Sequence, residues 1–438
     1  MFQCGFYEKE ITPPLGCFLP GYFSLRVGGD VKDRLYARAM VIKNEEKMVA
    51  IISIDGCTFE KEVRDMVTER IKEYIGLEAE NVLMGYIHTH TGIPRVHYSG
   101  DKKAEKNQES YWQVFGKLIA DCAILAYYRL EESLLLYGKG EANGISFCRN
   151  YFMKNSTPRT NPPRMSSDII GPVSETDNDL PVLFVKDKAG NPRGALITFA
   201  CHADCVGENV YSGDFVSEMS KQLKKTYGED FVTVFLQGTS GNINHFDVTK
   251  ENEKPDHYRM MGKVLAGEAE KTVAFAENIN GDILKSKLEY ITIKRRQISD
   301  EKIAKARHII DTVKEIPGAR VTADNSDPEQ YNLAMSKKLI DFIDSSPEEY
   351  VLPVQFIQIG DFKLYGFPAE IFCQFGKFVK SRTDTDKCMV SALCNISNGY
   401  VPTPDLMYDT IYEARPGANL LEENAGFILA EKLIEMGK

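Results

Sequence analysis

Histidines are few in this chain, and three of them stand where short apolar segments end. There are only seven in 438 residues. His88 and His90 follow the segment VLMGYI, and His202 follows ALITFAC. On a β-strand, side chains at positions i and i+2 point to the same face, so His88 and His90 are expected to project into one cavity. The arrangement is typical of a metal site, although hydrogen-bonded or surface histidines give the same pattern.

An acidic ligand is needed to complete such a site. A catalytic zinc ion commonly has three His and Glu/Asp ligands and one open position. Glu370, in LYGFPAEIF, is the candidate because it follows an apolar strand and a Pro turn. The alternative interpretation of Glu370 is a carboxylate at the N-terminus of a helix, where the helix dipole favours negative charge. Both interpretations are open at this point.

The segments that must position these residues alternate between strand and helix. An apolar, β-branched run at 48–55 precedes a helix-like segment at 60–75 and another apolar run at 81–87. The same alternation recurs in the segments 195–201, 214–227, 231–236 and 255–275. This order predicts βαβ units, and in such sheets ligands bind beyond the carboxyl ends of the strands. The expected class is α/β, with mixed β-sheets flanked by helices.

The last part of the chain has a more antiparallel pattern. Segments 350–359 and 363–367 flank Gly360-Asp361, which predicts a hairpin. Segment 389–393 predicts one further strand, and 426–436 predicts a terminal helix.

Composition excludes several classes of protein. The chain is 43% hydrophobic and 26% charged, as in globular proteins, and no apolar run approaches the roughly 18 residues of a membrane span. A net charge of -10 without a basic cluster argues against a nucleic-acid partner. The acidic N-terminus lacks a signal-peptide pattern, so a cytoplasmic location is expected, with the ten cysteines mostly reduced. The oligomeric state has no signature in the sequence.

Ten short segments, in order along nearly the whole chain, resemble the N-terminal catalytic domain of the neutral/alkaline non-lysosomal ceramidases. They are ITPPLG, LYARAM, IHTHTG, SFCRN, FACHADC, SGDF, QGTSGNIN, FPAE, NGYV and IYEA. The resemblance implies a zinc ion with four ligands: His88, His202, Glu370 and Tyr400. It also implies three side chains that face the substrate: His90, Arg149 and Tyr412. Tyr412 lies twelve residues beyond Tyr400, the spacing of the two tyrosines in the family.

One position departs from the family pattern. Where these ceramidases have a serine assigned as a nucleophile, this chain has Asn244. An amide cannot replace a hydroxyl nucleophile, so we expect attack by metal-activated water, with zinc lowering the pKa of the water and polarising the carbonyl. His90 would act as general base or acid, and Arg149 and Tyr412 would stabilise the oxyanion.

The predicted function is therefore a zinc-dependent hydrolase that cleaves a linear amide of a small N-acyl substrate. Residues 1–438 are expected to form a single ceramidase-like domain without the family's C-terminal β-sandwich domain or secretory signal, and these differences disfavour ceramide itself. The alternatives are a carboxylester hydrolase using the same site and a zinc- or ligand-binding protein without turnover. A cysteine hydrolase based on Cys201 or Cys205 is less favoured, because neighbouring residues on a strand point to opposite faces.

Two further segments contain polar residues of open role. Residues 150–173 are rich in polar residues and prolines and are predicted to form a long loop. Its Arg159 and Arg164 are candidates to hold an anionic group such as a carboxylate, against ordinary solvated loop charges. His245 and Asp247 are candidates for the pocket or a second metal site, against a loop histidine with a capping aspartate.

Overall fold

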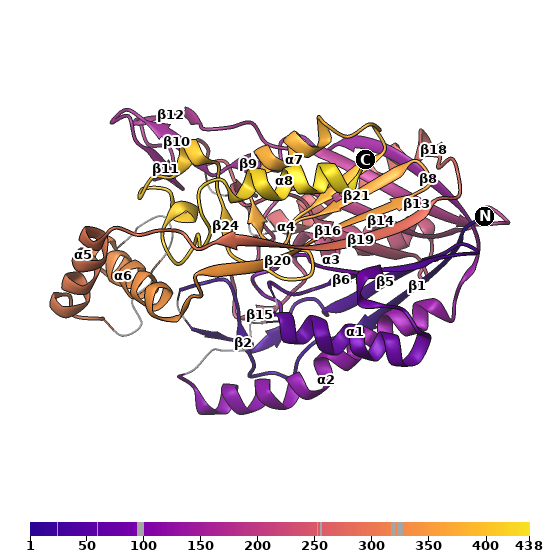
Figure 1. The fold of residues 1–438 in the computed structure, drawn as a ribbon, viewed down its shortest axis with the longest axis horizontal. Coiled ribbons are helices and arrows are strands. Elements are labelled where there is room, and N and C mark those ends of the chain that lie inside the picture. The colour runs from indigo at the N-terminus through magenta and orange to yellow at the C-terminus, as the bar shows by residue number, and fades with distance from the viewer. Residues whose placement is uncertain are drawn as a thin grey trace.

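Two β-sheets pack face to face between layers of helices (Figure 1). The computed structural model describes residues 1–23, 25–58, 60–93, 100–251, 253–254, 256–316, 321 and 327–438. Apolar residues of both sheets share one buried cluster, which includes Ile51 and Leu236 of the larger sheet and Ile357 and Met389 of the smaller one. The mixed α/β class predicted from the sequence is confirmed.

The larger sheet has nine strands in the described part of the chain. Eight of them form a continuous path in the spatial order β16 (Val232–Gln237), β14 (Pro192–Phe199), β13 (Asp179–Asp187), β8 (Glu131–Glu141), β1 (Gln3–Glu10), β5 (Tyr36–Lys43), β6 (Met48–Ile54) and β7 (Val82–Tyr86). The short β18 (Glu277–Asn278) pairs with β8. The pairs β6/β7 and β14/β16 are parallel, and the other neighbours on the path are antiparallel.

Both predicted βαβ units are present. Helix α1 (Lys61–Ile75) connects β6 to β7, and α3 (Asp214–Tyr227) connects β14 to β16. Each helix buries one apolar face against the outer side of the larger sheet, together with α2 (Lys102–Tyr127) and α4 (His257–Ala274). The predicted helix at 255–275 corresponds to α4, and residue 255 lies outside the described residues.

The smaller sheet covers the opposite face of the larger one. Its spatial order is β19 (Leu284–Lys294), β20 (Glu349–Ile359), β21 (Phe362–Gly366) and β23 (Cys388–Ser391). The predicted hairpin is confirmed, because β20 and β21 pair antiparallel with Ile359 opposite Phe362. Gly360 turns the chain with φ 57°, a left-handed conformation that glycine adopts without steric cost. Helices α7 (Cys373–Lys380) and α8 (Ala425–Met436) pack on the outer face of this sheet.

The loop predicted at 150–173 is wrong. This segment forms a three-stranded sheet of β10 (Asn150–Met153), β11 (Pro158–Thr160) and β12 (Ile169–Pro172). Pro158 begins β11 and Pro172 ends β12, positions at which a strand tolerates a missing donor. Pro162 and Pro163 lie between β11 and β12, so none of the four prolines prevents pairing. Arg159 is therefore a strand residue, and Arg164 lies in the turn that follows.

The remaining elements are short, apart from two helices at one end of the molecule, α5 (Asp300–Thr312) and α6 (Pro328–Ser345) (Figure 1). The short strands are β2 (Phe18–Leu19), β3 (Arg26–Val27), β4 (Asp30–Val31), β9 (Phe147–Cys148), β15 (Val210–Tyr211), β17 (Ile243–Asn244), β22 (Glu370–Ile371) and β24 (Tyr400–Val401). Three short 3-10 helices are η1 (Ala79–Asn81), η2 (Pro404–Leu406) and η3 (Tyr412–Ala414). Among the described residues, no helix has the length and apolar character needed to cross a bilayer.

The two ends of the larger sheet approach each other, although β7 and β16 are farthest apart in its order. The Ser53 hydroxyl of β6 donates to the Phe235 carbonyl of β16 at 2.6 Å. Gly85 of β7 lies so close to Leu236 that a Cβ atom at this position would be 2.6 Å from its Cδ2. This curvature brings the carboxyl ends of the two parallel strand pairs together.

Candidate metal centre and active site

Three side chains with metal-binding atoms converge beyond the ends of the strands. The Nε2 atom of His88 lies 3.1 Å from Oε2 of Glu370, and the Nε2 atom of His202 lies 3.6 Å from the same oxygen. His88 follows β7, His202 follows β14, and Glu370 begins β22. Glu370 precedes α7 rather than lying in its first turn, so the interpretation as a carboxylate at a helix N-terminus is wrong.

Backbone carbonyls fix the orientation of both imidazoles. Nδ1 of His88 lies 3.0 Å from the carbonyl oxygen of Cys57, and Nδ1 of His202 lies 3.0 Å from those of Ser240 and Ile243. Because a carbonyl can only accept a hydrogen bond, Nδ1 carries the proton in each ring. The Nε2 atoms of both rings are thereby directed at Glu370, as in many metal sites whose histidines are oriented by hydrogen bonds at Nδ1.

The backbone at His88 differs from the expected strand. β7 ends at Tyr86, and His88 has φ 64°, a left-handed conformation that is uncommon outside glycine and tends to occur at functional sites. The strand alternation predicted for His88 and His90 is therefore wrong. Their rings nevertheless lie 5.1 Å apart, because the chain turns between them.

The ionisable groups of the cluster fit a site that a divalent cation enters by displacing a proton. Burial opposes a charge on His88, but Cys57 and Glu370 raise the pKa of its imidazole well above the usual range, so it is protonated at neutral pH in the absence of a cation. Burial, assisted by the Arg149 guanidinium, lowers the pKa of His202 to about 3, so this imidazole is neutral at neutral pH. Burial disfavours the Glu370 carboxylate, but the two imidazoles hold its pKa well below its usual range. Nε2 of His88 and Oε2 of Glu370 face each other at 3.1 Å as a buried ion pair, and neither has another hydrogen-bond partner within the described chain. Neutral imidazoles and a carboxylate are the forms that bind a divalent cation.

Tyr400 and Tyr412 stand on one side of this cluster. β24 pairs with β22 so that Tyr400 is opposite Glu370, and its hydroxyl lies 3.4 Å from Nε2 of His202. The Tyr412 ring is 5.6 Å from the Tyr400 ring at an interplanar angle of 69°. Burial and the Glu370 charge raise the pKa of both phenols, so both hydroxyls are protonated at neutral pH in the absence of a cation.

His90 stands on another side and has an acidic partner. Its Nδ1 lies 3.3 Å from Oδ1 of Asp204, which also accepts a hydrogen bond of 2.7 Å from the Tyr22 hydroxyl. Burial disfavours the Asp204 carboxylate, but the neighbouring imidazoles keep its pKa below the usual range, so it is ionised. Sequence reasoning missed Asp204, although it lies two residues after His202 in FACHADC.

Arg149 is buried beside His202 with a fixed orientation. Its Nε donates to Glu413 and its Nη2 to the Gly241 carbonyl at 2.7 Å, which leaves Nη1 3.4 Å from Nε2 of His202. Burial opposes the charge, but Glu413 raises the pKa of the guanidinium above its usual range. Glu413 was also missed by sequence reasoning, although it follows Tyr412 in IYEA.

Asn244 is buried and takes part in an amide contact. It lies in β17, and its Nδ2 donates to Oδ1 of Asn161 at 3.0 Å. Asn161 in turn donates its backbone N–H to the Arg149 carbonyl. Asn244 is thus linked to the backbone of Arg149 through Asn161.

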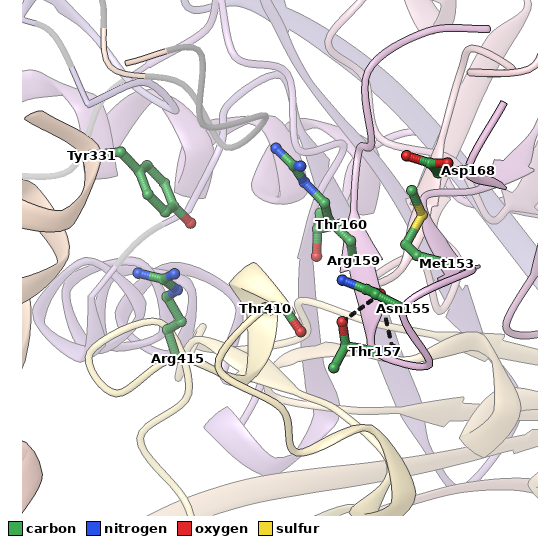
Figure 2. A pocket seen from close by; sticks show the side chains of 9 residues that line it. All are labelled: Met153, Asn155, Thr157, Arg159, Thr160, Asp168, Tyr331, Thr410 and Arg415. Carbon is green, nitrogen blue, oxygen red and sulfur yellow. Dashed lines mark hydrogen bonds between the residues drawn. The ribbon is translucent and has the colours of Figure 1, made fainter. Parts of the chain in front are cut away.

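The other candidate residues have different surroundings. The Asp247 carboxylate lies 3.2 Å from the Lys250 ammonium and accepts from Thr249, and neither it nor His245 belongs to a group of potential metal ligands in the described residues. Arg164 forms an ion pair of 2.6 Å with Glu253. Arg159 lines a separate cavity (Figure 2), and Thr160 in the same lining accepts the backbone N–H of Tyr412.

The family model described as neutral/alkaline non-lysosomal ceramidase, N-terminal, matches residues 2–246. The chain belongs to this family. His88, His90, Arg149, His202 and Asn244 lie within the matched residues, whereas Glu370, Tyr400 and Tyr412 lie beyond them.

Two curated relatives of this ceramidase-family chain come from Dictyostelium discoideum. Neutral ceramidase A is 23% identical over 310 residues, which are 65% of this chain and 42% of that protein. Neutral ceramidase B is 24% identical over 243 residues, which are 52% of this chain and 33% of that protein. The chain thus spans less than half the length of the curated relatives it matches.

Solved ceramidase structures share the fold of this chain. The neutral ceramidase from Pseudomonas aeruginosa superposes with a TM-score of 0.71 at 19% identity, over all of this chain and 74% of that one. A ceramidase complexed with C2 superposes with a TM-score of 0.72, also at 19% identity and with the same coverage. The predicted family and its α/β architecture are both confirmed.

Proposed function

We propose that this protein is a zinc-dependent hydrolase that cleaves the linear amide bond of a small N-acyl substrate. The observation that carries the proposal is the convergence of His88, His202 and Glu370 in a chain of the ceramidase family. Membership of that family supports amide hydrolysis as the kind of reaction. The three-ligand set supports zinc, because two imidazoles and one carboxylate with room for a further ligand are typical of catalytic zinc sites.

In this proposal His88, His202, Glu370 and Tyr400 hold the zinc ion. A bound zinc ion supplies Lewis acidity to the substrate carbonyl and lowers the pKa of water at the site. Tyr400 is the weakest donor of the four, because its phenol has to lose a proton to bind as an anion and burial holds its pKa well above the usual range.

His90 is proposed to move the proton during the reaction. Its Nδ1 faces the ionised Asp204, which would hold the Nδ1 proton and leave Nε2 as the atom that exchanges a proton with the substrate. Asp204 is then a positioning residue, and the Tyr22 hydroxyl keeps its carboxylate in place.

Arg149 and Tyr412 are proposed to stabilise the oxyanion of the tetrahedral intermediate. Two of the three guanidinium nitrogens of Arg149 are engaged by Glu413 and Gly241, so the third, Nη1, is held toward the cluster before substrate arrives. A donor that is fixed in advance costs no reorganisation in the transition state. The protonated hydroxyl of Tyr412, whose ring packs against that of Tyr400, would supply a second donor.

No side-chain nucleophile is required in this proposal. Asn244 has no hydroxyl, and its amide already donates to Asn161. The Cys201 and Cys205 thiols are poor substitutes, because burial holds the pKa of both well above the usual range and so disfavours the thiolate. We therefore expect Asn244→Ser to give no gain in turnover, whereas a serine-dependent mechanism predicts a large gain.

We also propose that residues 1–438 function as one domain and that the substrate is not ceramide. The shared apolar cluster between the two sheets supports the single domain. A cavity with Arg159 and Arg415 in its lining supports a substrate more polar than a neutral lipid.

The second candidate is a zinc-binding protein without turnover, and Asn244 in the serine position favours it. Four fixed ligands that include Tyr400 would close the coordination shell and leave no position for a substrate oxygen. An enzyme requires one position that water or substrate can occupy. Turnover in a screen of N-acyl amino acids, N-acyl amines and short esters separates the two candidates, and the esters test the carboxylester alternative.

The metal is tested first. Protein purified without added metal is expected to hold about one zinc ion per chain. His88→Ala and Glu370→Ala are each expected to abolish binding, whereas His308→Ala, at an exposed position on α5, should leave it intact. Absence of zinc, together with no hydrolysis on adding it, would exclude the zinc enzyme. Hydrolysis that survives both ligand substitutions would mean that the active site lies elsewhere.

A further inference from the structure

A cavity of about 280 Å³ adjoins the candidate active site, and charged side chains line it (Figure 2). Arg159 enters from β11, Tyr331 from α6, and Arg415 from the residue that follows η3. Asp168, between β11 and β12, contributes an acidic side chain to the lining. Among the described lining residues, the two arginines and the Tyr331 hydroxyl are donors that suit an anion.

The Arg415 side chain is positioned by a hydrogen bond from its Nε and by stacking of its guanidinium on the Tyr331 ring. Its Nε donates to the Asp409 carbonyl at 2.7 Å, and its Cζ lies 4.7 Å from the centre of the Tyr331 ring. Within the described part of the chain, its Nη1 and Nη2 form no hydrogen bond or ion pair. These two donors form the fork that binds a carboxylate through two hydrogen bonds.

Tyr331 supplies a neutral donor next to that fork. Its side chain is almost fully buried, and Phe23 contacts it edge-on at 6.1 Å between ring centres. Burial raises the pKa of the Tyr331 phenol, although the neighbouring arginines oppose the shift, so the hydroxyl keeps its proton at neutral pH. Figure 2 shows the hydroxyl of Tyr331 and the guanidinium groups of Arg159 and Arg415 extending toward the same space.

The cavity is connected to the active-site residues through Thr160. This lining residue donates its hydroxyl to Glu413, the partner of Arg149, at 2.7 Å and accepts the backbone N–H of Tyr412 at 2.9 Å. Phe23 contacts both Tyr331 and Tyr412, at 6.1 and 5.7 Å between ring centres. The cavity is thus connected to Tyr412 through Thr160 and Phe23, whereas His88, His202 and Glu370 do not line it.

We propose that this cavity binds a carboxylate that the substrate carries at a distance from its amide bond, with Arg415 and Tyr331 as specificity-determining residues. The proposal rests on the proposed amide hydrolysis and names the substrate class more closely. The planar fork of Nη1 and Nη2 of Arg415 matches the two coplanar oxygens of a carboxylate, and the Tyr331 hydroxyl can donate a further hydrogen bond. The spacer is required because the cavity is separate from the ligand cluster: His88, His202 and Glu370 do not line it, and it connects to Arg149, beside His202, through Thr160 and Glu413.

The test compares N-octanoyl ω-amino acids of increasing chain length with the matched terminal carboxamides and phosphonates. A second series carries the ω-carboxylate on the acyl chain. Release of the acyl product is measured for each compound. We expect one chain length, in one series, to show a kcat/KM for the carboxylate that exceeds those of its carboxamide and phosphonate. Arg415→Gln should lower the ratio of carboxylate to carboxamide by about 10- to 100-fold, the worth of a charge-assisted hydrogen bond.

Three variants separate recognition from a structural role. Arg415→Lys keeps the charge and should retain part of the ratio. Tyr331→Phe keeps the ring beneath Arg415, removes only the hydroxyl, and should lower the ratio by about 5- to 10-fold. Arg164→Gln, whose arginine is paired with Glu253 outside the cavity lining, should leave the ratio unchanged. Thermal unfolding checks that each variant is folded.

The outcomes distinguish this inference from the proposed function. Hydrolysis of the carboxamides without any preference for carboxylates, or a preference that survives Arg415→Gln, would overturn the inference and leave the amide hydrolase intact. If no compound is hydrolysed, binding of N-acetyl ω-amino acids by calorimetry decides. If Arg415→Gln weakens this binding at least about 10-fold, the result supports a carboxylate site in the cavity even without hydrolysis. If the substitution leaves the binding unchanged, the inference is overturned.

Discussion

The buried ion pair between Arg149 and Glu413 provides the sharpest test of how the site is assembled. Glu413 is fully buried, and it accepts hydrogen bonds from Nε of Arg149 and from the Thr160 hydroxyl. Arg149 is also buried and has the Gly241 carbonyl as its second partner. Removing either charge alone leaves the other charge buried without its partner. Removing both leaves only two uncharged polar groups in need of water or a new partner.

The expected magnitudes follow from this arrangement. Arg149→Met and Glu413→Leu should each lower the free energy of unfolding by about 3–5 kcal/mol, the cost of breaking a buried pair from one side. The double variant should lose only about 2–4 kcal/mol, because the stranded Gly241 carbonyl and Thr160 hydroxyl cost about 1–2 kcal/mol each. The coupling free energy between the two positions is therefore expected to be about 3 kcal/mol or more.

Urea unfolding at neutral pH gives the free energy of unfolding of the wild type, the two single variants and the double variant. A chelator in the buffer removes any contribution from bound metal. Equal m-values among the four would show that the comparison is between like transitions. If the double variant loses the sum of the two single losses within about 0.5 kcal/mol, the residues do not act as a pair. Arg149 would then need another explanation for its orientation beside His202.

Three further predictions concern the rest of the molecule. Asp204→Asn should lower kcat for amide hydrolysis about 10- to 100-fold with little change in KM, and an unchanged kcat would contradict its role in positioning His90. Gly85→Ala should lower the free energy of unfolding by about 1–3 kcal/mol in urea, because the new methyl group overlaps Leu236, whereas Gly171→Ala, where nothing lies within 4 Å, should not. Burial opposes the charge of Lys380, but Asp177 and Asp179 raise its pKa above the usual value. Its contribution to stability is therefore complete below the unfolded-state pKa of about 10.4 and is lost as the pH rises from there through the raised pKa. The difference in stability between the wild type and Lys380→Met should therefore disappear in strongly alkaline urea titrations.

Much of the fold could be read from local pattern. Both βαβ units and the hairpin at Gly360 follow from apolar runs, intervening helices and a turn signal, all of which are local properties. The sheet at 150–173 was missed because its strands are only three or four residues long and carry prolines at their ends. Pairing of strands that short depends on neighbours, which local pattern does not report.

The side chains that orient the site residues could not be predicted from local sequence pattern. Asp204 and Glu413 both lie inside segments that the sequence singles out, yet nothing in their spacing pairs them with His90 and Arg149. Arg149 and Glu413 are 264 positions apart in the chain. A sequence pattern can nominate a residue type at a strand end, but the partner that orients it depends on how distant segments pack.

The geometry of the ligand cluster is a consequence of sheet packing rather than of any one motif. His88 and His202 follow strands of the larger sheet, whereas Glu370 follows β21 of the smaller sheet. Their distances are therefore set by the apolar layer that joins the sheets, in which Leu236 and Ile357 are both completely buried. Because the curvature at Gly85 draws the two parallel strand pairs together, a change in that layer moves the histidines relative to each other as well as relative to the carboxylate. Substitutions in the core between the sheets should accordingly alter metal affinity without touching a ligand.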